Sequence, residues 1–271
     1  MVWLDNSRIC AIFALVFLHT AAGVVIGSEI GSEYWWIGNF YDSLVRWCVP
    51  VFVMISGALL LDPYKNEDLK TFYTKRVSRI IVPIIFWSAF FLLWATLKGM
   101  MEGASPSLIE LAKKILSGKP HYHMWFLYMI ITLYLFTPFF RKIVVNSTRR
   151  EISILVIFTF LLATLNAISE KLLSGGSKLF VNWFFSYIPY FFLGYLIRTD
   201  NRNFSKIILW GVYLLSSFLT SLGCYILAIN NNLDMGLYFY GYLSITVIPM
   251  SVSVMYLLKS WSSPIIVIYL I

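Results

Sequence analysis

The sequence predicts an all-α protein, a polytopic bundle of transmembrane helices with eight complete spans and the start of a ninth. Hydrophobic residues make up 59% of the 271 residues and charged residues only 13%, whereas a soluble domain has roughly 45–50% and 25%. The chain also holds 10 Trp, 17 Tyr and 22 Phe, which suit the aromatic belts of a membrane protein. These proportions exclude a water-soluble globular enzyme, because too few charged residues are present to cover its surface.

The predicted spans are windows of about 20 mostly apolar residues, the length that a helix needs to cross a bilayer. The eight complete windows cover residues 9–28, 44–61, 80–97, 124–140, 152–168, 180–197, 207–229 and 237–258. A ninth run begins near Ser262 and reaches Ile271, and because ten residues cannot cross a bilayer, we expect the chain to end inside a span. Four prolines within the windows are expected to kink their helices; these are Pro50, Pro83, Pro189 and Pro249.

The orientation follows from the basic residues, which are enriched in cytoplasmic loops. With the N-terminus inside, 14 of the 21 Lys and Arg residues fall on the inner side and 7 on the outer side. We therefore expect a multi-pass membrane protein with a cytoplasmic N-terminus. The alternative for the first window is a signal peptide, because residues 21–23 resemble a cleavage site, but its basic region is only Arg8 preceded by Asp5.

Other classes of site receive no support from the composition. The net charge is +8, yet the basic residues are spread over short loops, so nucleic acid is not an expected partner. Cys10, Cys48 and Cys224 all fall in apolar stretches without the spacing of metal ligands, so we expect neither a disulfide framework nor a metal site. No fixed repeat and no long loop divides the chain, and residues 1–271 are expected to form one transmembrane domain.

The strongest candidate for chemistry is His19, the one histidine inside a predicted span. An imidazole can be neutral at that depth and still exchange a proton, as a general base must. Arg8 lies eleven residues earlier, which is about 20° beyond three full turns and about 16.5 Å along a helix. Both residues therefore share one side of the helix, with Arg8 at the cytoplasmic mouth and His19 near mid-membrane. A histidine that only hydrogen-bonds a neighbouring helix is the alternative.

A second cationic group precedes the third span. Arg76 and Arg79 are three residues apart, so they share a helix face and would add charge to the positive end of the helix dipole. Guanidinium groups at a helix N-terminus suit phosphates. The ordinary excess of basic residues in cytoplasmic loops explains the same pair equally well.

On the outer side, Asp42 and Arg46 are four residues apart at the start of the second span and are expected to pair within the helix. Residues 121–126 read His-Tyr-His-Met-Trp-Phe and offer hydrogen-bonding and stacking groups for a sugar, with an interfacial aromatic belt as the alternative. The small pair Ser56 and Gly57 lies within the second span, where close helix packing is the simpler explanation.

Taken in order, these motifs resemble the acyltransferase-3 family of integral membrane acyltransferases. The first is an Arg and a His separated by ten residues in the first span, here Arg8 and His19. The others are an Arg with Pro-x-Phe-x-x-x-Ser-Gly in the second span, an Arg-x-x-Arg before the third, and Tyr-His-x-Trp-Phe entering the fourth. They match, in that order, Arg46 with Pro50, Phe52, Ser56 and Gly57; Arg76 and Arg79; and Tyr122, His123, Trp125 and Phe126. The last motif, with Tyr134 and Pro138, is similar to the surface-polysaccharide O-acetyltransferases of bacteria.

The resemblance implies an O-acyltransferase that moves an acetyl or similar acyl group from cytoplasmic acetyl-CoA to a sugar hydroxyl of a glycan or lipid-linked saccharide. It implies no permanently bound cofactor, with acetyl-CoA as co-substrate. It also implies a place in the bacterial inner membrane. Charge and position place Arg8, Arg76 and Arg79 at the phosphates of the acyl donor, and His19 is expected to act as general base, with a covalent acyl-histidine as the alternative. The residues expected to support the site or bind the acceptor are Arg46, Ser56, Tyr122, His123 and Trp125. The sequence departs from many members in having Leu127-Tyr128-Met129-Ile130 where they place a glutamate.

Two other functions fit the same residues. In a secondary transporter or exporter of a polysaccharide or anionic substrate, His19 would relay protons and the arginines would bind the cargo. In a structural subunit of a glycan-assembly complex, His19 would be a packing residue.

Overall fold

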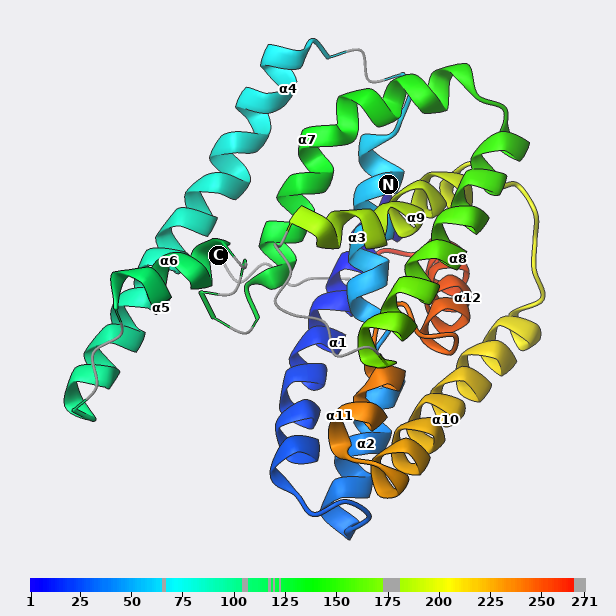
Figure 1. Ribbon diagram of the computed structural model, residues 1–271. Helices are drawn as coiled ribbons and strands as arrows, with labels where there is room; N and C mark the ends of the chain where they lie inside the picture. Colours follow the sequence, from blue (N-terminus) through cyan, green and yellow to red (C-terminus); the bar gives the residue numbers. More distant parts are fainter. Residues whose placement is uncertain are drawn as a thin grey trace. The chain divides into compact units, whose positions relative to one another are not determined.

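The computed structural model describes residues 1–64, 67–103, 107–116, 118, 120–121, 123–172 and 181–265. Within these ranges every regular element is a helix, as the sequence predicts (Figure 1). The chain divides into two compact units. The first contains Met1–Leu59, Arg149–Ser174 and Pro189–Ile271, and the second contains Leu60–Thr148 and Gly175–Ile188.

The helices of the first unit are α1, α2, most of α3, α8, the later part of α9, and α10 to α12, with one short 3₁₀ helix, η2. Their bounds are α1 Val2–Gly27, α2 Glu33–Val45, α3 Cys48–Leu60, α8 Arg149–Leu172, α9 Val181–Arg198, α10 Lys206–Asn230, α11 Leu233–Gly236, η2 Leu237–Tyr240 and α12 Val247–Lys259. The second unit holds α4 Leu69–Arg76, the π-helical turn η1 Val77–Ile81, α5 Val82–Met101, α6 Leu108–Leu116 and α7 Trp125–Asn146.

The protein has helices suited to a membrane. Five helical runs in the described part of the chain are long and apolar enough to cross one: Val2–Gly27, Glu33–Leu60, Leu69–Met101, Trp125–Asn146 and Lys206–Asn230. The expected span at 152–168 is helical within α8, and the described part of the expected span at 180–197, from Val181 onward, is helical in α9. Eight complete spans therefore stay a prediction, while the all-helical membrane fold is confirmed.

The expectation for residues 237–258 is wrong, because they do not form one helix. They begin with η2, pass through turns at 241–246, and become helical only at Val247. The 13 residues of α12 cover about 20 Å, less than the ~30 Å hydrocarbon core. Pro249 lies in the first turn of α12, where its missing N–H would have no intrahelical partner in any case.

Two other prolines also mark helix starts instead of kinks. Pro50 lies in the first turn of α3 and Pro83 in the first turn of α5. Pro50 cannot donate to the carbonyl of Arg46, which explains why α2 ends at Val45 and α3 begins at Cys48. Pro83 likewise follows the π-helical turn η1, since its ring disrupts the regular i→i−4 pattern before it. Pro189 lies inside α9, as expected.

Two glycines allow α3 and α9 to touch backbone to backbone in the first unit. A Cβ at Gly57 would lie 1.8 Å from the carbonyl oxygen of Phe191, and one at Gly194 would lie 1.9 Å from that of Met54. Only hydrogen fits at either position. The glycine of the Ser-Gly pair therefore serves helix packing, the explanation the sequence favoured.

A buried carboxylate ties together several helix ends of the first unit. Asp200, which follows α9, accepts two hydrogen bonds from Arg202 Nε, at 3.0 and 3.1 Å, and one from Arg202 Nη2 at 2.8 Å. Arg149 at the start of α8 lies 3.3 Å from the same carboxylate, and the Tyr256 hydroxyl of α12 donates to it at 2.6 Å. Lys259 donates to the carbonyl of Ile197 at 2.6 Å and to the carbonyl of Asp200.

Asp200→Asn is expected to lower the stability of the protein in a pH-dependent way. Hydrogen bonds from Arg202 hold the pKa of Asp200 well below its ordinary value of 3.8. A lowered carboxylate pKa stabilises the folded state fully above the unfolded pKa, and the contribution is lost as the pH falls below it. Thermal unfolding in detergent should therefore show a lower midpoint for the variant at pH 7 and a difference that shrinks below pH 3.8. A constant difference would contradict this.

Candidate functional site

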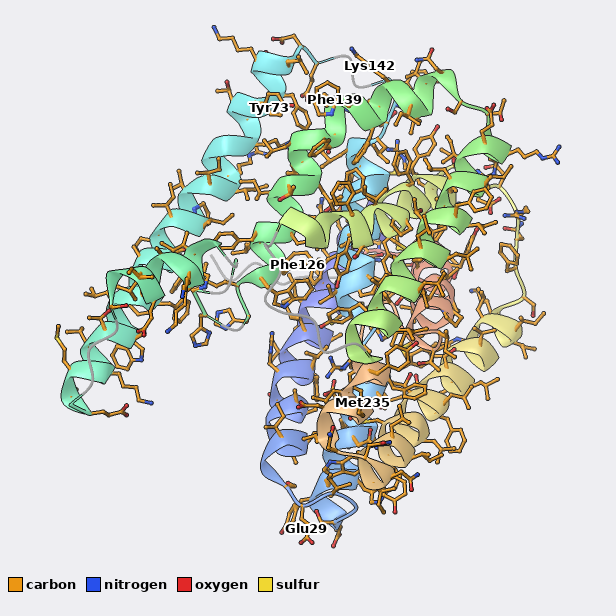
Figure 2. The ribbon with its side chains drawn as sticks, in the orientation of Figure 1. Glu29, Tyr73, Phe126, Phe139, Lys142 and Met235 are labelled. Carbon is orange, nitrogen blue, oxygen red and sulfur yellow. The ribbon has the colours of Figure 1, made fainter. Side chains whose placement is uncertain are left out.

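His19 and the Asp42–Arg46 pair lie at one level of the α1–α2 hairpin. The two helices run antiparallel and pack together, joined by a short turn that holds Glu29 (Figures 1 and 2). His19 precedes the end of α1 at Gly27 by eight residues, or about 12 Å. Asp42 follows the start of α2 at Glu33 by nine residues, or about 13.5 Å. The hairpin thus places both at the same distance from its turn.

Asp42 and Arg46 form a buried ion pair beside the imidazole. Arg46 Nη2 lies 2.5 Å from Asp42 Oδ2, and the two side chains are 11% and 0% exposed. His19 is half-buried and interacts electrostatically with both charges. The imidazole of His19 therefore lies within electrostatic range of one carboxylate and one guanidinium. Because the pair is buried, these charges act more strongly on one another than they would in water.

The sequence predicted the ion pair but not its depth. We expected Asp42 and Arg46 at the outer start of a span over 44–61, and the helical run instead covers Glu33–Leu60. The pair therefore lies inside the run, interrupted only at Arg46 and Trp47. The signal that could have shown this is the aromatic stretch Tyr34-Trp35-Trp36, because it continues the apolar window toward the N-terminus.

Hydrogen bonds from distant parts of the first unit fix Arg46. Its Nη1 donates to the carbonyl of Tyr240 at 3.3 Å, and its guanidinium carbon lies 4.1 Å from the centroid of the Tyr240 ring. The Tyr240 hydroxyl donates to Asn39 Oδ1 at 2.7 Å, and Asn39 Nδ2 donates to the carbonyl of Ser221 at 3.0 Å. This network links α2 to η2 and α10, so the arginine is held rigidly.

A cavity of about 230 Å³ opens at the pair. Ala22 and Val25 of α1 form one side, and the Asp42–Arg46 pair and Tyr240 form others. Ala22 follows His19 by three residues and shares its helix face. The cavity thus lies within one helical turn of the imidazole.

Arg8 occupies the expected place on α1 but is solvent-exposed. The helix is continuous from Val2 to Gly27, so Arg8 and His19 share a side of it, as predicted. Arg8 Nη1 pairs with Asp5 Oδ1 at 3.1 Å, and the two side chains are 46% and 61% exposed. A role for Arg8 in binding stays a prediction.

Arg76 and Arg79 do not lie at a helix N-terminus, and that expectation is wrong. The helix begins at Leu69, so both arginines follow its first turn. The reason is the polar run Leu69–Arg76, which is helical although its composition suggests a loop. The helix dipole therefore offers these arginines no added positive charge, and their role in binding phosphates stays a prediction.

Within the second unit Arg76 and Arg141 both lie near the ring of Phe72. From the sequence, Arg141 counted only among the basic residues of the inner side. The guanidinium carbons of the two arginines lie 5.4 and 5.0 Å from the centroid of the buried Phe72 ring. Glu67 lies 2.8 Å from Lys75 and 4.0 Å from Arg141. The hydrogen bond from Lys75 lowers the pKa of Glu67, and the nearby positive charges lower it further. In the same unit Tyr73 of α4 donates to the carbonyl of Leu135 in α7 at 2.8 Å (Figure 2).

The expected acceptor-side residues are found as follows. His123 Nδ1 lies 2.8 Å from His121 Nδ1, and the His121 ring stacks on Phe91 at 4.4 Å between centroids. Trp125 begins α7, with its ring 5.8 Å from that of Tyr187. Ser56 is half-buried in α3, and Tyr122 lies outside the described residues. The roles of these residues stay predictions.

A model of one known family, described as an acyltransferase domain, matches residues 1–271. The chain belongs to this acyltransferase family. The match covers the whole sequence, and it agrees with the motifs that Arg8, His19, Arg46, Arg76 and Arg79 form along the chain. The family and the long apolar helices together indicate a membrane acyltransferase. No curated protein and no solved structure matches the chain.

Proposed function

We propose that this acyltransferase moves an acetyl or similar acyl group from cytoplasmic acetyl-CoA to a sugar hydroxyl of a surface glycan or its lipid-linked precursor. The observation that carries the proposal is the half-buried imidazole of His19 beside the buried Asp42–Arg46 pair and a cavity. Transfer to a hydroxyl needs a base that is neutral before the reaction and positive after it. Burial and the nearby Arg46 favour the neutral imidazole that can accept a proton, while the Asp42 carboxylate favours the imidazolium that forms.

The transfer requires four changes of bonding. His19 takes the proton of the acceptor hydroxyl, and the oxygen forms a bond to the thioester carbonyl carbon. The carbon–sulfur bond then breaks, and the CoA thiolate takes the proton from the imidazolium. The products are an oxygen ester and CoA, and His19 returns to its neutral form. Asp42 stabilises the imidazolium while it exists.

The acyl donor is anionic and needs positively charged ligands. Acetyl-CoA carries several phosphates, for which guanidinium groups are the preferred side-chain ligands. In the first unit Arg8 is proposed for this role, and in the second unit Arg76 and Arg79. The stacking of Arg76 and Arg141 on one Phe72 ring supports the assignment, since it concentrates positive charge near Arg76. The proposal places the protein in the bacterial inner membrane with its N-terminus in the cytoplasm.

The proposal is tested with purified protein in proteoliposomes, acetyl-CoA labelled in the acetyl group, and lipid-linked saccharides extracted from bacterial membranes. We expect label in the saccharide fraction, one equivalent of free CoA thiol for each label transferred, and release of the label by mild alkali, which cleaves O-acyl but not N-acyl groups. Saccharide that crosses the vesicle membrane without loss of thioester would contradict the proposal and identify a transporter.

A further inference from the structure

Two buried polar atoms of the ion pair have no hydrogen-bond partner in the described part of the chain. They are Asp42 Oδ1 and Arg46 Nε. The Asp42 side chain is 0% exposed, and leaving a charged group's acceptor unpaired in such a place is unfavourable. Both residues line the cavity of about 230 Å³. A ligand in the cavity would therefore supply the missing hydrogen-bond partners of both atoms.

The two atoms select one kind of ligand group. Asp42 Oδ1 accepts a hydrogen bond and Arg46 Nε donates one. A hydroxyl satisfies both, because its O–H donates to the carboxylate while its oxygen accepts from the guanidinium. An anionic ligand group would be repelled by Asp42, and a cationic one by Arg46.

The size and lining of the cavity suit a sugar ring. A single water needs only about 10–15 Å³, far less than the space present. Val25 and Leu237 offer apolar surface for ring C–H groups, and Tyr240 offers an aromatic ring. Ala22 places this wall one helical turn from His19, so a ring bound here can present a neighbouring hydroxyl to the imidazole.

We propose that Asp42 and Arg46 bind the acceptor hydroxyl adjacent to the one that His19 deprotonates, so that the enzyme recognises a vicinal diol. Asp42 is then a substrate-binding residue, a role that no motif in the sequence indicated. The inference rests on the proposed acyl transfer and adds the geometry of the acceptor to it.

The test compares trans-cyclohexane-1,2-diol with cyclohexanol as acceptors of labelled acetyl from acetyl-CoA. For the wild-type protein we expect kcat/KM to be about twentyfold higher for the diol, because one hydrogen bond to a charged group provides about tenfold and the two equivalent hydroxyls provide about twofold. Asp42→Asn should bring the ratio close to the factor of about two that two equivalent hydroxyls give. The ratio does not depend on how much protein is folded, so a purely structural role of Asp42 would leave it unchanged.

A second variant covers the case in which Asp42→Asn is inactive. Ala22→Leu narrows the cavity without removing a charge and should lower the same ratio. A ratio that stays at the wild-type value in the active variants, or that is near two in the wild type, overturns the inference while acyl transfer stands. Transfer to neither alcohol and to no saccharide overturns the proposed function, and the inference with it.

Discussion

His19→Ala is expected to lower the rate of acyl transfer by about two to four orders of magnitude, the contribution of a general base. The variant should still insert, because the alanine keeps α1 helical and removes no group of the Asp42–Arg46 pair. Transfer from labelled acetyl-CoA, normalised to the amount of protein that elutes as a single species in detergent, measures the effect. The two alternative functions predict other results. A transporter transfers no label from the thioester even as the wild type, and for a structural subunit His19→Ala leaves the amount of transferred label the same as in the wild type.

Thr20→Ala is the matched control for this experiment. Thr20 follows His19 on the same helix, is exposed, and donates a hydrogen bond only to the carbonyl of Val16. We expect its transfer rate to stay within about twofold of the wild type, since exposed substitutions have small effects. Added imidazole should restore part of the activity of His19→Ala and leave Thr20→Ala unchanged. A His19→Ala protein with full activity would remove the imidazole from the mechanism.

Arg46→Gln is expected to destabilise the protein by about 3–5 kcal/mol, because it leaves the buried Asp42 carboxylate without its partner. The side chain of Asp42 is 0% exposed, so its charge is poorly compensated once the guanidinium is removed. The variant also loses the hydrogen bond to the carbonyl of Tyr240. Denaturant titration in mixed micelles, followed by tryptophan fluorescence, gives the difference in the free energy of unfolding.

Two further variants separate charge burial from other effects. Lys98→Gln breaks an i,i+4 ion pair with Glu102 whose side chains are 66% and 64% exposed, and it should cost less than about 1 kcal/mol. The double variant Asp42→Asn with Arg46→Gln makes the pair neutral and should recover much of the stability lost in Arg46→Gln. Equal losses for Arg46→Gln and Lys98→Gln would show that the pair is not buried in the folded protein.

The fold class and the common side of Arg8 and His19 on α1 could be predicted from the sequence because both depend on local patterns. An apolar window predicts a helix, and the spacing of Arg8 and His19 fixes their common side. The burial of the polar residues of α2 could not be predicted in this way. It depends on distant partners, since the buried Asn39 donates to the carbonyl of Ser221, 182 positions away. Single-sequence patterns do not contain such long-range contacts.

The same limit explains the incomplete prediction of the site. Arg46 was assigned a supporting role from its motif, while Asp42 was seen only as its partner within a helix. The electrostatic interaction of both charges with His19 depends on the packing of α1 against α2. The predicted helix start near Arg76 was wrong for a different reason. The composition of Leu69–Arg76 disfavours a helix, yet this segment is helical.

The hairpin of α1 and α2 also affects how the centre is assembled. His19, Asp42 and Arg46 are separated by fewer than thirty positions and by a turn of five residues, Ser28 to Ser32. Closing so short a loop costs little chain entropy, and contacts of low sequence separation form quickly. His19 and its charged neighbours can thus come together as soon as the first two helices have left the ribosome, before the segments that later hold Arg46 have been synthesised.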